Sequence, residues 1–210
     1  MYILLAFLLG SVAGGGYAAL RRGPASPGGK ALSLPALLTA AANGALWALC
    51  CLRFGVTPDG ALCCALSSVL LAAALIDART GEIPPLCSLA ALVLGALRLV
   101  LDLSLWQTRL LGLVAVAGPL LLLLLLTKGR AIGGGDVKLL AGCGLFLGWK
   151  LIILAFLLAC ILGSVIHLVR MRFFGAERTL ALGPYLAAGV FVCLLWGQSL
   201  LDAYLRLFWR

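Results

Sequence analysis

Long, almost uninterrupted apolar runs recur through residues 2–201, and only short polar joints separate them. The runs are about 18 to 25 residues long, the length that an α-helix needs to cross a hydrocarbon core of roughly 30 Å. A β-barrel would instead show segments of about ten residues with alternating polarity, whereas a stretch such as residues 120–126 is continuously apolar. The sequence therefore predicts an all-α fold, a polytopic transmembrane helical bundle.

Charged residues, Pro and Gly divide the chain into eight predicted segments, of which six to eight are expected to cross the membrane. Residues 138–148 are too few for a full crossing, and this segment is expected to be tilted or partly re-entrant. The joints leave no room for a soluble domain, so residues 1–210 are predicted to form a single membrane-embedded domain. The predicted helices are residues 2–20, 34–53, 60–77, 85–101, 110–127, 138–148, 151–169 and 181–201.

The composition supports this interpretation, since 64% of the residues are hydrophobic and 11% are charged. Soluble domains average roughly half apolar and a quarter charged residues. The net charge of +9 comes from Lys and Arg at the ends of apolar runs, where topology signals belong, so no nucleic-acid partner is expected. The first segment is expected to be retained rather than cleaved as a signal, because Arg21 and Arg22 follow it and no basic residue precedes it.

The basic residues also predict the orientation of the chain. If the N-terminus is external, ten of the sixteen Lys and Arg residues lie on the cytoplasmic side. This orientation is favoured because cytoplasmic joints carry the excess of Lys and Arg. The ten residues predicted to be cytoplasmic are Arg21, Arg22, Lys30, Arg79, Lys128, Arg130, Lys138, Arg170, Arg172 and Arg178.

The eight cysteines form no CxxC pair, and the chain has one histidine, His167, within an apolar run. Cysteines without such spacing indicate neither a zinc site nor a disulfide framework. In apolar helices they are expected to be small packing residues. No metal site and no cofactor are therefore predicted, and His167 is expected to pack or to lie at the membrane interface.

Two of the seven acidic residues stand out. Asp77 ends the apolar run of residues 61–76, where a carboxylate is costly unless it is paired or used. Asp136 follows three glycines, which allow close approach of another chain, and opens a helical pattern. Local interpretations remain open for both: Asp136 as a helix N-cap, and Asp77 as a solvated helix end paired with Arg79.

Paired carboxyl groups have a specific chemistry. Two carboxyls within about 3 Å tend to share one proton, because they cannot easily both ionise. The ionised group can take a proton from water while the neutral group donates one to a scissile carbonyl oxygen. Asp77 and Asp136 therefore form a candidate site for peptide hydrolysis without a covalent intermediate.

Four short motifs are spread over nearly the whole chain. They are Gly10-Ser11 with Arg21-Arg22-Gly23-Pro24, Asp77 with Ile83-Pro84, Ala131-Ile132-Gly133-Gly134-Gly135-Asp136-Val137-Lys138-Leu139, and Leu182-Gly183-Pro184-Tyr185-Leu186. In this order they resemble the motifs of type IV prepilin leader peptidases, and the third resembles the GxGD signature of that family.

The resemblance implies that Asp77 and Asp136 are the catalytic pair of an aspartyl peptidase in a bacterial inner membrane. Its partners would be prepilin or pseudopilin precursors of type IV pili, type II secretion or DNA uptake, whose short basic leader the family cuts at the cytoplasmic face. Many members carry a domain with two CxxC pairs between their first two helices and link it to N-methylation of the new pilin terminus. Here residues 21–33 are too few for that domain and contain no cysteine, so methyltransferase activity is expected to be absent.

Two alternatives belong to other classes of protein. A small transporter would place acids or broken helices near the membrane midplane, whereas these acids lie at predicted helix ends. A noncatalytic assembly protein of a pilus or secretion system would not require both aspartates.

Overall fold

The computed structural model describes residues 2–20, 34–129, 132–174 and 181–208, without the side chains of residues 13–20, 174 and 208. All regular elements in these ranges are helices, which confirms the all-α prediction. The predicted joint at residues 21–33 with its Arg-x-Pro motif, and the predicted cytoplasmic residues Arg130 and Arg178, lie outside the described residues.

Five helical stretches in these ranges are long and apolar enough to cross a membrane. The chain is therefore a multi-pass membrane protein. The five stretches are Leu34–Phe54, Pro58–Thr80, Leu103–Leu126, Trp149–Phe173 and Gly183–Leu207. The described residues belong to two compact units, Met1–Ala72 and Ala73–Arg210.

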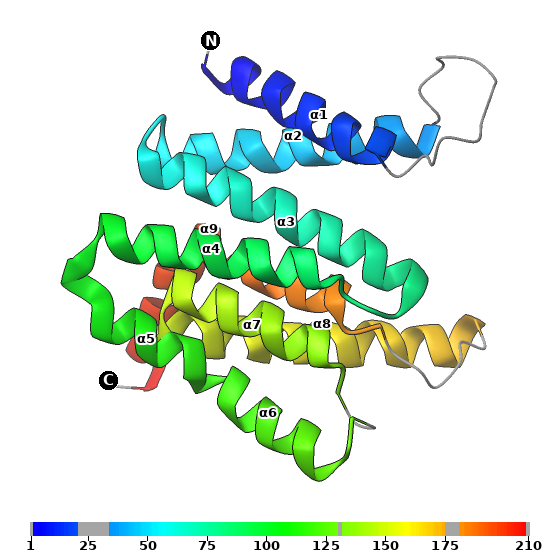
Figure 1. Cartoon of the computed structure of the whole chain (residues 1–210), viewed down its shortest axis with the longest axis vertical. Coiled ribbons are helices and arrows are strands. Elements are labelled where there is room, and N and C mark those ends of the chain that lie inside the picture. The colour runs from blue at the N-terminus through cyan, green and yellow to red at the C-terminus, as the bar shows by residue number, and fades with distance from the viewer. Residues whose placement is uncertain (1, 21–33, 130–131, 175–180, 209–210) are drawn as a thin grey trace. The chain divides into compact units, whose positions relative to one another are not determined.

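The first unit contains α1 (Tyr2–Leu20), α2 (Leu34–Phe54) and the first part of α3 (Pro58–Thr80), with α1 packed along α2 (Figure 1). Two polar side chains of α2 donate hydrogen bonds within the unit, which lowers the cost of placing them in an apolar environment. The Asn43 amide donates to the Gly10 carbonyl at 2.8 Å. The Trp47 indole N–H donates to the Ser68 hydroxyl, also at 2.8 Å.

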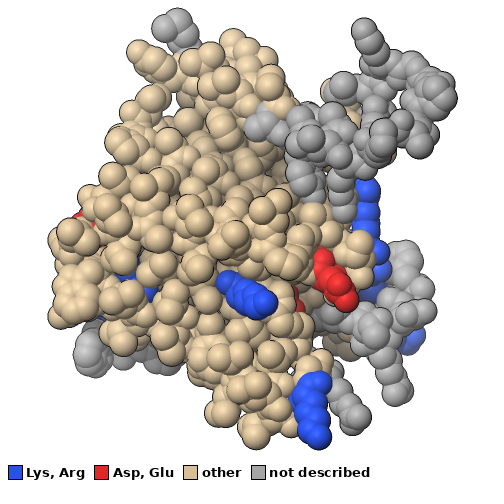
Figure 2. Space-filling model, viewed as in Figure 1, with Lys and Arg blue, Asp and Glu red and all other residues tan. Residues whose placement is uncertain are grey.

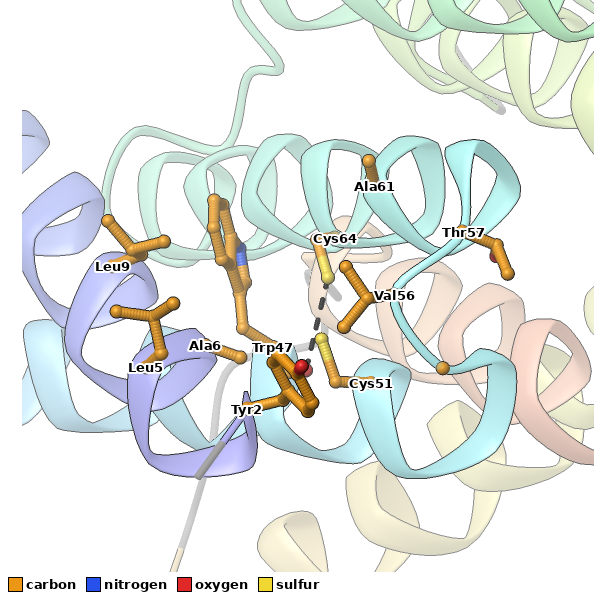
Figure 3. A pocket seen from close by; sticks show the side chains of 11 residues that line it. Tyr2, Leu5, Ala6, Leu9, Trp47, Cys51, Val56, Thr57, Ala61 and Cys64 are labelled. Carbon is orange, nitrogen blue, oxygen red and sulfur yellow. Dashed lines mark hydrogen bonds between the residues drawn. The ribbon is translucent and has the colours of Figure 1, made fainter.

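An apolar pocket of about 190 Å³ lies among these three helices (Figure 3). Cys51 and Cys64 line it, and the Cys64 thiol donates to the Trp47 carbonyl oxygen at 3.9 Å. All eight cysteines of the chain are free and none is fully exposed. Five are buried and three are partly buried, as expected of small packing residues.

The second unit contains the end of α3 and the remaining helices. They are α4 (Pro85–Leu101), η1 (Leu103–Leu105), α5 (Trp106–Ala115), α6 (Ala117–Leu126), α7 (Gly134–Leu147), α8 (Trp149–Phe174) and α9 (Gly183–Phe208). Helix α7 is the centre of this unit, because it contacts α4, α5, α6, α8 and α9. Figure 1 shows α4 along one side of α7 and α6 on the opposite side.

Glycines let the neighbours of α7 approach its backbone closely. A Cβ atom on Gly142 would lie 2.6 Å from the Leu92 backbone nitrogen of α4. A Cβ atom on Gly144 would overlap the Gly112 carbonyl oxygen of α5, and the reverse overlap holds for Gly112. Small residues at helix contacts are typical of membrane proteins, where close packing replaces the hydrophobic effect as the source of stability.

The predicted segments begin within a few residues of the observed helices, but α8 and α9 continue five and seven residues beyond their predicted ends, to Phe174 and Phe208. Two further differences have local causes. The segment predicted over residues 110–127 is two helices that meet at Val116. Pro119 has no N–H to donate to the carbonyl of Ala115, so the helix is interrupted there. Helix α7 begins at Gly134 rather than at residue 138. Its 14 residues correspond to about 21 Å, which is shorter than a hydrocarbon core of about 30 Å.

Candidate active site

Asp77 lies in the last turn of α3, and its side chain is buried with 4% of the residue exposed. Helix α3 ends beyond it because Gly81 adopts a left-handed backbone conformation, with φ of 69°. The Gly81 N–H donates to the Asp77 carbonyl oxygen at 2.8 Å. Glycine adopts this conformation without steric cost. The interpretation of Asp77 as a solvated helix end is therefore wrong, although Arg79 next to it is exposed.

The Asp77 carboxylate contacts the N-terminus of α9. The Gly183 N–H donates to Asp77 Oδ2 at 2.8 Å, although the two residues are 106 positions apart in the chain. Gly183 is the first residue of α9, so its N–H has no partner within the helix. The positive end of the helix dipole favours a negative charge at this position.

Asp136 lies in the first turn of α7 as its third residue. The N-cap position is occupied by Gly133, and no side chain caps the helix there. The N-cap interpretation of Asp136 is therefore wrong. Its side chain instead accepts a hydrogen bond from the Gly133 backbone, as the acidic residue of a capping box does. Its Oδ1 atom is buried and has no hydrogen-bond partner among the described residues.

The two carboxyl groups interact. Burial and the nearby charge of Asp77 raise the pKa of Asp136 from 3.8 to about 6, against the opposing effect of the Gly133 hydrogen bond. Asp136 belongs to none of the five stretches that are long enough to span a membrane. A raised pKa means that Asp136 keeps its proton at pH values at which a free aspartate is ionised. The structure thus brings together the two acids that the sequence singled out.

The three glycines before Asp136 have different surroundings. A Cβ atom on Gly135 would lie 2.9 Å from Cβ of Ile83, and the Ser88 hydroxyl donates to the Gly135 carbonyl at 3.4 Å. A Cβ atom on Gly133 would lie 3.3 Å from Asp136 Oδ2, whereas one on Gly134 would meet nothing within 4 Å. Gly133 and Gly135 are thus restricted by their neighbours, whereas Gly134 is not. Ile83, which follows Asp77 by six residues, packs against the start of α7 at Gly135.

Other candidate groups do not gather here. The described residues contain no group of three or more His, Cys, Asp or Glu side chains that could hold a metal ion. His167 is partly buried in α8. Figure 2 shows a face that is largely uncharged, with only a few Lys, Arg, Asp and Glu side chains visible. The sequence did not indicate the contact of Ser88 with Gly135 or the hydrogen bond from Gly183 to Asp77. Gly183 lies in one of the four motifs, whereas Ser88 lies in none of them.

Fold and site together define a class: multi-pass α-helical membrane proteins in which two aspartates from different helices interact. Residues 64–168 match the Type IV leader peptidase family. The matched range includes both aspartates and covers half of the chain. The chain belongs to this family.

Several curated relatives carry the name prepilin leader peptidase/N-methyltransferase. The protein of Burkholderia pseudomallei is 39% identical over 173 residues, which cover 74% of this chain and 53% of the relative. That of Pseudomonas aeruginosa is 32% identical over 187 residues, 85% of this chain and 62% of the relative. That of Bacillus subtilis is 30% identical over 167 residues, 77% of this chain and 66% of the relative. The chain thus spans between half and two thirds of the length of these relatives. No solved structure matches it.

Proposed function

We propose that this protein is a membrane aspartyl endopeptidase that removes the short basic leader of type IV prepilin-like precursors. Asp77 and Asp136 are its catalytic pair, and the reaction takes place at the cytoplasmic face of a bacterial inner membrane. The observation that carries the proposal is the interaction of these two carboxyl groups, each beside a helix N-terminus. Family membership and the names of the relatives support the substrate class.

The pair can hydrolyse a peptide bond with one shared proton. The ionised carboxylate takes a proton from water as the water oxygen attacks the scissile carbonyl carbon, and the neutral carboxyl donates its proton to the carbonyl oxygen. The resulting gem-diol collapses when the newly protonated carboxyl gives its proton to the peptide nitrogen and the C–N bond breaks. The other carboxylate recovers a proton from a diol hydroxyl. The products are a free carboxyl and a free amine, and the pair returns to its starting state.

Co-expression with a candidate prepilin tests this proposal. Leader removal is read on a gel as a shortened product, and the new N-terminus is identified by mass spectrometry. We expect cleavage just before the hydrophobic segment of the prepilin. A panel of prepilins and pseudopilins that all keep their leaders would contradict the proposed activity.

The proposed orientation predicts which joints face the cytoplasm. Lys128, at the end of α6, is exposed and is expected to be cytoplasmic, whereas Ser104 in η1 is exposed and is expected to be external. Each is changed to Cys in a background without native cysteines, and intact cells are treated with a thiol reagent that does not cross the membrane. Ser104→Cys should react and Lys128→Cys should react only after the cells are opened. The opposite pattern would reverse the orientation.

Cleavage is expected to occur without methylation of the product. The chain has no cysteine-containing insertion between its first two predicted helices, since residues 21–33 contain no cysteine. Mass spectrometry of the mature pilin from cells in which this chain is the sole processing enzyme should give an unmethylated N-terminal amine. A product heavier by one methyl group at its N-terminus would show that this prediction is wrong.

A further inference from the structure

We infer that the backbone N–H of Gly183 is a positioning group that holds Asp77 as the ionised member of the pair. Asp77 is then the general base that activates water, and Asp136 is the general acid that protonates the scissile carbonyl. This division of roles rests on the proposed function and goes beyond it, because a shared proton by itself does not say which carboxyl holds it.

A hydrogen bond joins Gly183 to Asp77. The Gly183 N–H donates to Asp77 Oδ2 at 2.8 Å in a buried environment. A hydrogen bond from a backbone N–H stabilises the ionised form of a carboxyl group. The donor is also one of the N–H groups that a helix N-terminus leaves without a partner, and the helix dipole acts in the same direction. Both the Gly183 N–H and the dipole of α9 thus stabilise the ionised form of Asp77.

The space between α9 and Asp77 at position 183 fits a glycine. A Cβ atom at position 183 would lie 2.6 Å from Asp77 Oδ2 and 2.8 Å from both Cβ and Cγ of Asp77. Contacts this short do not occur for real side chains, so only glycine lets the α9 backbone reach the carboxylate. The next residue, Pro184, restricts the backbone before it and is well suited to the first turn of a helix. The N–H is therefore held toward Asp77 by the local sequence.

The surroundings of Asp136 differ from those of Asp77. Asp136 Oδ1 is buried without a hydrogen-bond partner among the described residues. This is expected of a carboxyl oxygen that hydrogen-bonds to the substrate when the substrate is bound. Its pKa of about 6 is raised by burial and by the charge of Asp77. The charged side chains nearest to the pair along these elements, Arg79, Glu82 and Lys138, are exposed. The described surroundings thus favour the proton on Asp136.

The test compares the pH dependence of kcat/KM for prepilin cleavage in Gly183→Ala and in the native protein. The acid limb of the profile reports the general base and the alkaline limb reports the general acid. Moving Asp77 away from the Gly183 N–H should shift the acid limb to higher pH by about one to two units. This is the change in pKa that corresponds to the loss of one hydrogen bond to a charged group. The alkaline limb, which reports Asp136, should stay where it lies in the native protein. The maximum should fall by about 10²-fold, as expected for a misplaced catalytic group.

Gly197→Ala is the matched control. It makes the same substitution in the same helix about 21 Å from Gly183. The one close contact of the added Cβ there is with the flexible end of the Leu151 side chain, at 2.8 Å, and Cys193 Cβ lies at an ordinary 3.5 Å. The profile of this control should match the native one. If Gly183→Ala leaves both limbs in place, Gly183 has a purely structural role, and if it moves the alkaline limb instead, the roles of the aspartates are reversed. Either result overturns the inference but leaves the proposed peptidase activity standing, whereas failure of the native protein to cleave any prepilin removes the activity itself.

Chemical labelling of the native protein tests the same division of roles without any variant. An aryl glycidyl ether alkylates a carboxylate anion when the anion opens the epoxide, whereas a diazoacetyl ester esterifies a protonated carboxyl with loss of nitrogen. After protease digestion and mass spectrometry, the epoxide label is expected on Asp77 and the diazo label on Asp136. Epoxide labelling of Asp136, or of neither aspartate, would overturn the inference.

Discussion

Asp136→Asn is expected to insert and fold like the native protein and to leave prepilins uncleaved. Asparagine keeps nearly the same shape and can still accept the Gly133 hydrogen bond, but it cannot hold or transfer the shared proton. General acid–base groups contribute about 10² to 10⁴-fold in rate. We expect a loss of at least this size, measured as the rate of leader removal at equal amounts of folded protein in membranes.

Two acidic residues outside the pair provide the controls. Glu82 is exposed in the turn that follows α3, and Asp202 is exposed near the end of α9. Glu82→Gln and Asp202→Asn remove the same kind of charge and should keep cleavage within about threefold of the native rate, since surface changes alter stability by only about 0.5 kcal/mol. A loss of activity in the controls equal to that in Asp136→Asn would show that the assay responds to net charge rather than to the pair.

Gly142→Ala is expected to destabilise the second unit strongly, because the added Cβ would lie 2.6 Å from the Leu92 nitrogen and 2.8 Å from the Ala91 carbonyl carbon. These are backbone atoms of α4, so neither can be relieved by rotating a side chain. Overpacking of this kind costs about 1 to 3 kcal/mol and occasionally more. It outweighs the gain of about 0.5 to 1 kcal/mol that Ala brings to a helix over Gly. The free energy of unfolding in detergent, and the yield of folded protein, should both fall.

Gly134→Ala makes the same change in the same helix at a position where the added Cβ meets nothing within 4 Å. It should leave the unfolding free energy unchanged or slightly raised. If the two variants had equal stability, close packing of α4 on α7 would not be what holds α7 in the centre of the second unit.

The sequence predicted the helices and singled out both acids because these depend on local patterns. Apolar runs between charged residues gave the starts of the helices to within a few residues, and two acids beside helix ends stood out among the seven. The role of Asp77 and Asp136 in catalysis stays a prediction, since the structure contains no substrate. The resemblance to the leader peptidases is confirmed by the family match.

Contacts between distant segments could not be predicted. Nothing local to Asp77 indicates that its partner is a backbone N–H 106 residues away. The sequence leaves an N-cap role open for Asp136, because acidic residues favour that position. In the structure, however, Ile83 and Ser88 lie against Gly135, and α7 begins two residues before the aspartate. Arg109 is one of the six basic residues that the charge count leaves on the external side, and the structure shows that it is buried and pairs with Asp102 at 3.0 Å.

Steady-state rates of the purified, membrane-reconstituted protein test the central claim most directly. The native protein, Asp77→Asn, Asp136→Asn and the double variant are assayed on one prepilin, and folding is verified for each. Groups that act as a unit are non-additive, so each single variant should lose nearly all activity, by about 10² to 10⁴-fold, and the double variant should be little worse than either. A well-folded Asp77→Asn or Asp136→Asn protein that removed the leader at near the native rate would contradict the account.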